Sequence, residues 1–499
     1  MRLAVIKKTM LAVLCLLMIF AAASCVEEAE TGAYYMTDSD ITTTDPQLVS
    51  TKAELSFAYA CYDRLYTFDK NGKLTNGRQV SDVKVSSDEK TYTFTLSDGF
   101  YWSDGETPVT AEDYAFGIKR ALQSLTEAPY AGLLSSIRSV SADKNRLTIN
   151  LSTADKVIKY ALSHPVSAPC NSKFFNSTKG KYGLSKDTII TNGAFHIYSW
   201  DTDEGIMSLR RSSADKTAGN PSLSYARIYY GADNNELIAS AKEDTYNIYS
   251  SDSDVFREYT VGKAGKIDSF ETTYCLYASD NMNKSNIDIA AMLIYDIDRD
   301  SLSINLPDYC RSAESIVPSD LLSEETAYSK SHKALNLAGY NKENAVKLRG
   351  DDKKTFDYLS KITLYYPDFS AAKTYASLIT QTWQRDLNAY INPVAYKESD
   401  LSSILNTDED TPVLAIIPIK SNDSTADGAV KYLMDIGLIN QSVKTDADIT
   451  AVQQSLVNSN RLYPLFEASY RFFTDEKITA VSLIPYSGVI DFRYITKAN

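Results

Sequence analysis

The sequence predicts an α/β protein of two or three lobes. The 499 residues are 44% hydrophobic and 23% charged, as in ordinary globular chains. At about 100 to 200 residues per domain, the length predicts two or three domains. Segments with strand and helix periodicity alternate in the second half of the chain, as in α/β folds. The formal net charge of −13 disfavours nucleic acid as a partner, because phosphate-binding surfaces are basic.

The N-terminus has the pattern of a signal peptide. Arg2, Lys7 and Lys8 precede an unbroken apolar run over residues 10–23, and this order of charge and apolar residues is typical of secretion signals. The alternative is a membrane anchor, but about 14 apolar residues fall short of the ~20 that cross a bilayer. We therefore predict a signal peptide over residues 1–24, whose removal takes the formal charge from −13 to −16.

The end of this run, Ala22-Ala23-Ser24-Cys25, resembles a bacterial lipobox, in which the cysteine is lipidated and becomes the new N-terminus. Ala22 stands where leucine is usual, so ordinary cleavage near Ala23 is the alternative. With lipid on Cys25, the acidic residues 25–34 act as a tether. A soluble domain would then be held at the membrane surface.

The next segment, from Tyr62 to Leu151, reads as strand-rich and is interrupted by one helix. Tyr92, Phe94 and Leu96 alternate with threonines, which predicts a half-buried strand over 91–96. The alternating Leu147, Ile149 and Leu151 predict another strand. Ser-Asp-Gly triplets at 97–99 and 103–105 are typical of turns.

The helix in this unit begins after Thr110. Thr110 is the expected N-cap, and Asp113 completes a weak capping box. One face of the helix carries four apolar residues: Tyr114, Ile118, Leu122 and Leu125.

Two later segments read as strand, helix, strand. The first comprises residues 226–230, 234–241 and 246–249, and predicts a parallel pair with a helical crossover. The second starts with a strand at 362–366, continues with a helix capped by Ser370, and ends with strands near Ala395 and at 413–417. The last is a continuous apolar run, as in strands buried on both faces.

No motif indicates an enzyme, a metal site or a cofactor. His164, His196 and His332 are far apart and have no metal-ligand spacing, and the chain lacks a GxSxG elbow and a GxxxxGK loop. Tyrosine supplies 35 of the 55 aromatic residues, which suits a polar binding cleft because each ring adds a large contact face and a polar tip.

Four cysteines remain after the signal peptide and Cys25: Cys61, Cys170, Cys275 and Cys310. They form no CxxC pair, and the sequence alone leaves their pairing open, including four free thiols.

One long motif carries a family resemblance. The segment YTFTLSDGFYWSDG at residues 92–105, continued by PVTAED at 108–113, closely resembles the signature of the oligopeptide-binding (peptide/nickel) class of extracytoplasmic solute-binding proteins, family 5. Shorter motifs follow the same family order along the chain: DP at 45–46, YDRL at 62–65, TNGAF at 191–195, IDR at 297–299 and DFRY at 491–494.

The resemblance implies a two-lobed periplasmic-binding-protein-like fold of class II, with hinge strands and an additional β-rich subdomain. It implies that residues 35–59, 179–270 and 476–499 form lobe I, residues 60–178 the subdomain, and residues 271–475 lobe II. The implied function is that of a monomeric, lipid-anchored receptor that captures a peptide or related small solute by lobe closure and delivers it to an ABC permease. The alternatives are a surface scaffold or sensor that keeps the fold without transport, and a receptor for a non-peptide solute.

The resemblance also indicates ligand-binding residues. Pro129-Tyr130-Ala131 resembles the segment in which peptide binders place a cleft tyrosine, which makes Tyr130 a candidate. The strand around Cys275 and Tyr277 resembles the family strand that lines the cleft in the second lobe. Cys275 lacks the partner cysteine that some relatives hold, so it pairs elsewhere, with Cys310 for example, or stays free.

The chain departs from the family pattern at residues 416–424. Peptide receptors commonly carry Gly-Trp there, followed by an aspartate that pairs with the ammonium group of the peptide. In an ungapped alignment Lys420 takes the place of this aspartate, and Asp423 does so if the loop shifts by three residues. A lysine would repel a peptide N-terminus and favour a carboxylate or a blocked peptide. Both residues are therefore candidates.

Overall fold

The computed structural model describes residues 31–212, 221–283, 288–351, 353–406, 411–439 and 446–498. The predicted signal peptide and the predicted lipid site Cys25 lie outside these residues. Within the described ranges, no helix is both long and apolar enough to cross a membrane. The same ranges contain no group of three or more histidine, cysteine, aspartate or glutamate residues arranged to hold a metal ion.

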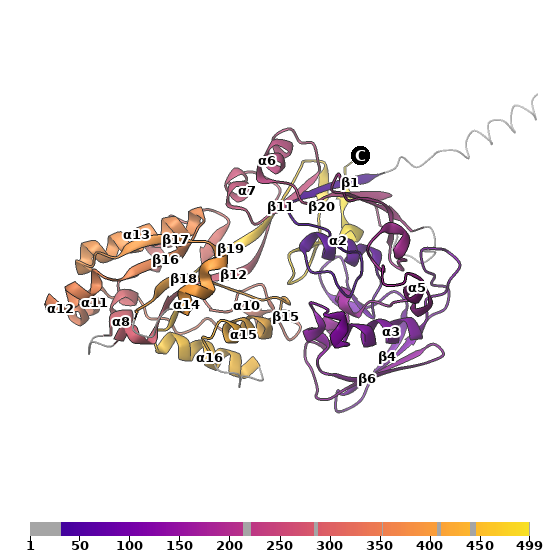
Figure 1. Ribbon diagram of the computed structural model, residues 1–499, viewed down its shortest axis with the longest axis horizontal. Coiled ribbons are helices and arrows are strands. Elements are labelled where there is room, and N and C mark those ends of the chain that lie inside the picture. The colour runs from indigo at the N-terminus through magenta and orange to yellow at the C-terminus, as the bar shows by residue number, and fades with distance from the viewer. Residues whose placement is uncertain are drawn as a thin grey trace, which may run out of the picture.

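Two lobes share one sheet (Figure 1), whose strand order is β17-β16-β18-β12-β19-β11-β1-β10-β9-β8. The long strands β12 (Lys266–Ala278) and β19 (Leu462–Thr474) are antiparallel neighbours in the middle of this order. One end of β19 pairs with β11 of lobe I, and β12 pairs with β18 of lobe II. These two strands therefore carry the chain between the lobes.

The lobe I part of the sheet is centred on β1 (Gly32–Thr37), which is parallel to both β10 (Tyr225–Tyr229) and β11 (Ile248–Ser251). The predicted strand, helix, strand unit is confirmed, with α6 (Asn234–Lys242) as its helix, but β1 lies between the two strands.

The predicted tether over 25–34 is too long, because residues 32–34 already pair with β10.

The other edge of lobe I is antiparallel, with β9 (Ile206–Arg211) next to β10, and β8 (Phe195–Asp201) next to β9. Helix α2 (Lys52–Cys61) starts with a capping box formed by Thr51 and Glu54, and its residues are almost all buried. After β19 the chain returns to lobe I, where β22 (Val489–Ile490) and the turn η7 (Phe492–Tyr494) contact α2.

The subdomain is a separate antiparallel sheet of order β4-β5-β7-β6. Its strands are β4 (Val80–Val85), β5 (Thr91–Leu96), β6 (Ile137–Asp143) and β7 (Arg146–Leu151). The strand predicted over 91–96 is confirmed, and its aromatic and leucine side chains are buried while its threonines are half-buried.

Helix α3 (Ala111–Ala121) has the predicted capping box of Thr110 and Asp113. The predicted apolar face is wrong at its C-terminal end. The helix stops at Ala121 and the chain turns into a short 3₁₀ helix over Ser124–Thr126, so Leu122 is 37% and Leu125 is 97% exposed.

The predicted strand and helix unit of lobe II is also confirmed. Strand β16 (Thr363–Pro367) is parallel to both β17 (Asn392–Tyr396) and β18 (Leu414–Lys420), with α13 (Ser370–Leu387) between β16 and β17 in the chain. Ser370 is the first helical residue rather than the cap, and its N–H donates to a carboxylate oxygen of Asp254 at 2.9 Å. Further helices of this lobe are α8 (Ile289–Tyr295), α11 (Lys342–Arg349), α15 (Ala426–Asp435) and α16 (Asp446–Asn458).

Lobe I and the subdomain share one hydrophobic core, and lobe II has further cores on the two faces of its sheet. Cys61, Cys170, Cys275 and Cys310 are buried free thiols. The cores of the described chain therefore hold together without a disulfide between these residues, the pairing of Cys275 with Cys310 included.

Candidate binding site between the lobes

Two segments of lobe II form the surface that meets lobe I. The first is the hairpin of β14 (Leu322–Ser323) and β15 (Thr326–Ala327), and the second is the loop 421–425 between β18 and α15. The N–H of Leu322 donates to the carbonyl of Ser424 at 2.9 Å, which joins the two segments. We call residues 322–327 and 421–425 the lobe II rim. Figure 1 shows β15 at the edge of lobe II nearest to lobe I.

Two ion pairs connect this rim to the subdomain. Lys156 pairs with Glu324, and the ammonium of Lys159 lies 2.5 Å from a carboxylate oxygen of Glu325. The hydroxyl of Tyr486, from the C-terminal segment, donates to the backbone carbonyl of Glu325 at 3.3 Å. The lobes are therefore in direct contact at one end of the space between them.

Tyr130 and Asp423, both predicted as site residues, belong to the subdomain and to the lobe II rim respectively. The Tyr130 ring lies against the His164 ring, with 4.3 Å between centroids, and its hydroxyl donates to the Ser50 carbonyl at 3.3 Å. Burial raises the pKa of Tyr130, and the negative charge of Asp423 raises this pKa further. Burial, then the neighbouring Tyr59 and then the charge of Asp423 raise the pKa of Tyr160. The charge of Asp423 in lobe II therefore acts on two tyrosines of the subdomain.

The loop around Asp423 is held by that side chain. The Ser421 hydroxyl donates to Oδ1 at 2.9 Å, as do the N–H and the hydroxyl of Thr425 at 3.1 and 2.6 Å. Ser424 has a φ of +63°, a conformation that non-glycine residues adopt at a cost. All three bonds go to Oδ1, and within the described part of the chain no donor reaches Oδ2. That oxygen is available to a ligand.

A second charged contact lies at the hinge. The Lys52 ammonium is 2.7 Å from a carboxylate oxygen of Glu271, 2.8 Å from the Ser487 carbonyl, and 4.6 Å from the centroid of the Tyr470 ring. Glu271 occupies a bulge in β12 where the register with β19 shifts. The sequence analysis did not predict this pair. A lysine in the first turn of a helix is unfavourable because it opposes the helix dipole, so its presence there indicates that the lysine has another partner.

His164 is part of the floor of the site rather than a ligand for metal. It is buried, its Nδ1 accepts a hydrogen bond from the Val166 N–H at 3.2 Å, and burial lowers its pKa to about 3. The ring is therefore neutral at physiological pH and supports Tyr130 by packing. Nothing in the sequence around His164 signals this contact, because Tyr130 is 34 residues away.

The other predicted site residues lie elsewhere. Lys420 forms an ion pair with Glu398 of lobe II. Cys275 is fully buried, and Tyr277 is 7% exposed in the same core. Alternate side chains of a strand point to the same face, so both β12 residues enter the core of lobe II. The structure does not bring Cys275 or Tyr277 to the surface between the lobes.

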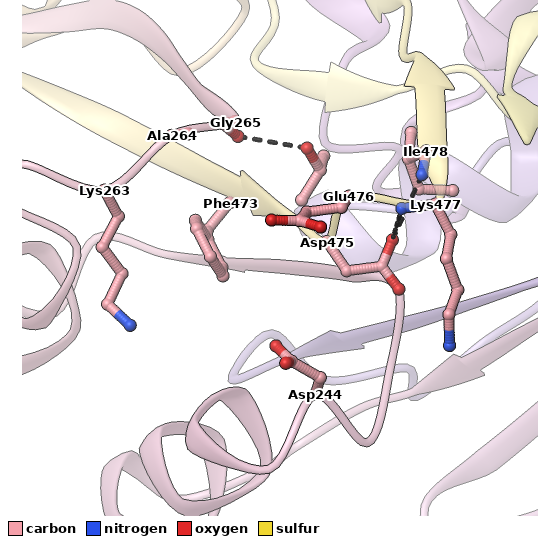
Figure 2. A pocket seen from close by; sticks show the side chains of 10 residues that line it. Asp244, Lys263, Ala264, Gly265, Phe473, Asp475, Glu476, Lys477 and Ile478 are labelled. Carbon is pink, nitrogen blue, oxygen red and sulfur yellow. Dashed lines mark hydrogen bonds between the residues drawn. The ribbon is translucent and has the colours of Figure 1, made fainter. Parts of the chain in front are cut away.

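A larger pocket of about 600 Å³ lies where β19 leaves the hinge, beside α6 (Figure 2). Two of its five charged side chains are engaged locally: Oδ1 of Asp475 accepts from the N–H groups of Lys477 and Ile478, and the Lys263 ammonium donates to the Tyr259 hydroxyl at 2.7 Å. The lining of this pocket includes no residue of the lobe II rim. The surface between the lobes is the better candidate.

Comparison with known proteins agrees with this architecture. The model of the bacterial extracellular solute-binding proteins, family 5 (middle part), matches residues 77–415. A dipeptide-binding protein of Lactococcus lactis is 30% identical over 162 residues, which cover 27% of this chain and 29% of that protein. The probable deoxycholate-binding periplasmic protein YgiS of Escherichia coli is 28% identical over 190 residues, 34% of this chain and 35% of that protein.

These matched stretches span about a third of the length of each curated relative. Among solved structures, Listeria monocytogenes OppA bound to peptide superimposes with a TM-score of 0.67 and 17% identity, over 95% of this chain and all of that chain. The predicted two-lobed periplasmic-binding fold is confirmed.

Proposed function

The chain belongs to the bacterial extracellular solute-binding proteins, family 5, and we propose from this premise that it captures a peptide between its lobes for an ABC importer. The observation that carries the proposal is the contact of the subdomain with the lobe II rim, where the charge of Asp423 acts on Tyr130 and Tyr160. Groups from the two sides act on one guest only when the lobes are together. The names of the peptide-binding relatives support the ligand class.

We propose that Asp423 supplies the negative charge for a cationic end of the ligand. Its Oδ1 holds the loop, and its Oδ2 accepts no hydrogen bond from a described residue. Lys420 is balanced by Glu398, which leaves its charge less able to repel an ammonium group. Peptides of varied sequence then bind through main-chain hydrogen bonds and terminal charges, with side chains in hydrated space.

Binding and closure are coupled in this proposal. A ligand with micromolar affinity supplies about 8 kcal/mol, and it shifts the lobes toward closure to the extent that the closed state binds it better. The lobes are connected through β12 and β19, so a change of backbone angles in these strands alters the angle between lobes without disturbing either core.

For the location of the protein we propose the extracytoplasmic face of the membrane, with lipid on Cys25 and a permease as partner. A Cys25→Ala variant is then expected in the medium or the soluble extract instead of the membrane fraction. Retention of this variant in the membrane would contradict the lipid anchor and would leave the ligand proposal unaffected.

The ligand proposal is tested by native mass spectrometry of the purified protein and by melting with peptide mixtures. We expect a mass excess of a few hundred daltons that denaturation releases as peptide, and a ligand at 100 times its Kd adds about 2.7 kcal/mol to stability. Asp423→Asn should weaken binding at least tenfold, whereas Asp435→Asn, at an exposed position of α15, should not.

Three outcomes contradict the proposal in different ways. A released compound that is not a peptide points to another solute, as the name of the deoxycholate-binding relative illustrates. Absence of any ligand together with unchanged melting in every peptide mixture indicates a scaffold or sensor. Equal peptide affinity in the Asp423→Asn variant and the wild type removes Asp423 from the site.

A further inference from the structure

A small cavity lies between the subdomain and the lobe II rim, with Tyr160 in its wall. Its volume is about 160 Å³, and its walls come from the subdomain, the C-terminal segment and the lobe II rim. The residues that matter here are Phe68, Leu74, Tyr160, Leu322, Glu325 and Tyr486. Because one wall belongs to lobe II, the cavity is complete only when the two lobes are together.

Three aromatic rings form most of the interior. The centroid of Phe68 lies 6.4 Å from that of Tyr160 and 6.3 Å from that of Tyr486, and the two tyrosine rings are 6.4 Å apart. Phe68 and Tyr160 are each 3% exposed. Rings at these distances attract further rings in edge-to-face geometry, so the interior suits another aromatic group.

Four of the five charged residues in the cavity wall form ion pairs. Lys156 pairs with Glu324, and Lys159 pairs with Glu325. The fifth, Lys73, is exposed and forms no ion pair with a described residue. A cationic side chain that entered the cavity would lose its water without a spare countercharge, which is costly. The cavity therefore selects against cationic groups.

Two residues of the cavity wall have strained backbone conformations. Glu324 and Tyr486 have φ values of +58° and +71°, and non-glycine residues held in this region often belong to ligand clamps. The buried Tyr160 hydroxyl approaches the Ser424 side chain but forms no hydrogen bond of ordinary geometry within the described chain.

We propose that this cavity is a subsite for one uncharged aromatic side chain of the ligand, of the size of phenylalanine; the inference rests on the proposed function. The volume of about 160 Å³ is enough for one benzene-sized ring. The ring completes the aromatic cluster and contacts both lobes at once, so a ligand that carries it favours the closed arrangement.

The test is calorimetry of the full soluble chain with tri-, tetra- and pentapeptides of alanine in which one phenylalanine occupies each position in turn. In the wild type, one position should bind roughly 10- to 100-fold tighter with phenylalanine than with alanine. Lysine at that position should bind no better than alanine.

Leu74, half-buried in β3 (Leu74–Asn76), is the position for the variants. In Leu74→Trp, whose larger ring fills the cavity, the phenylalanine-to-alanine affinity ratio should fall to about one. Leu125→Trp, at a position 97% exposed, should keep the wild-type ratio. Leu74→Ala enlarges the cavity and should shift the preference from phenylalanine toward tryptophan, which provides a second variant if the first folds poorly.

The possible failures are distinct. If peptides bind the wild type but the phenylalanine-to-alanine affinity ratio is near one at every position, the subsite is wrong and the proposed function stands. The phenylalanine-to-alanine affinity ratio could also be high in the wild type and remain unchanged in both Leu74→Trp and Leu74→Ala. The selectivity would then come from another part of the protein, and the subsite would be wrong. Failure of every peptide to bind the wild type overturns the proposed function, and the subsite with it.

Discussion

Lys52 and Glu271 form an ion pair with 2.7 Å between the ammonium and a carboxylate oxygen, and this pair joins helix α2 of lobe I to the hinge strand β12. The same ammonium donates to the Ser487 carbonyl at 2.8 Å, so three segments far apart in the sequence meet at one charge. Gly488 is required beside it, because a Cβ there would lie 2.0 Å from a carboxylate oxygen of Glu271.

Removal of this lysine should destabilise the protein. Lys52→Met leaves Glu271 partly buried without its cation, and we expect the free energy of unfolding to fall by about 1 to 3 kcal/mol. Urea unfolding measures the effect, with Lys70→Met, at an exposed position, as the control. Combined with Glu271→Gln, the loss should be smaller than the sum of the two single losses. Additive losses would show that the pair does not contribute as a unit.

The ion pairs of the lobe II rim should make lobe contact sensitive to salt. Both pairs are largely exposed, so each contributes about 0.2 to 1 kcal/mol. In Lys159→Glu, the mean distance between probes on the two lobes should increase, and the double variant Lys159→Glu/Glu325→Lys should restore it. In ~1 M salt, where the Debye length is about 3 Å, the mean distance between the probes should become the same in the wild type and the variants. A difference that persists in salt would indicate steric rather than electrostatic change.

Stability should decline as pH rises because of Asp296. Burial, and after it the charge of Asp386, raise the pKa of its carboxyl to about 7; within the described chain neither oxygen has a hydrogen-bond partner. The folded state therefore holds a proton that the unfolded state releases between pH 4 and 7, and stability falls across this window.

Asp296→Asn removes this titration. At pH 8 we expect the variant to be more stable than the wild type by about 1 to 2 kcal/mol, after allowance for partial solvation, and the difference should shrink at pH 5. Chemical unfolding at both pH values measures it. A variant that is less stable at pH 8 would mean that an ionised Asp296 has a favourable partner.

The four buried thiols should be inert in the native state. Burial raises the pKa of Cys61, Cys170, Cys275 and Cys310, which suppresses the reactive thiolate. Ellman's reagent should react with none of these four before unfolding and with all of them afterwards, in a chain that starts at residue 31. The melting temperature should not change with reductant. Fewer than four reactive thiols after unfolding would reveal a disulfide.

Local patterns predicted the strands and helices well where a single segment contains its own signal. The alternation at Tyr92, Phe94 and Leu96 gave the bounds of β5, and Thr110 with Asp113 gave the start of α3. The position of β1 between β10 and β11 could not be predicted in this way, because its partners are about 190 to 210 residues away in the sequence.

The site was predictable only in part, and for the same reason. The family resemblance supplied Tyr130 and Asp423, which lie on the two sides of the lobe contact, but also Cys275 and Tyr277, whose position on β12 directs them into the core. The partners that complete the site, such as Lys52, Tyr160 and Tyr486, are ordinary residues until the fold brings them together. Their role depends on contacts over 100 to 400 residues, for which a local pattern holds no information.

The central place of β1 has a consequence for how the chain matures. The first described strand pairs with residues 225–229 and 248–250, and β11 is in turn covered by β19 through residue 474. Contacts over such separations form late, because long loops must close first. Until the ribosome has added β19, in the last tenth of the polypeptide, strand β11 of lobe I has no partner on one side. We therefore expect lobe I to complete its fold only when synthesis is nearly finished.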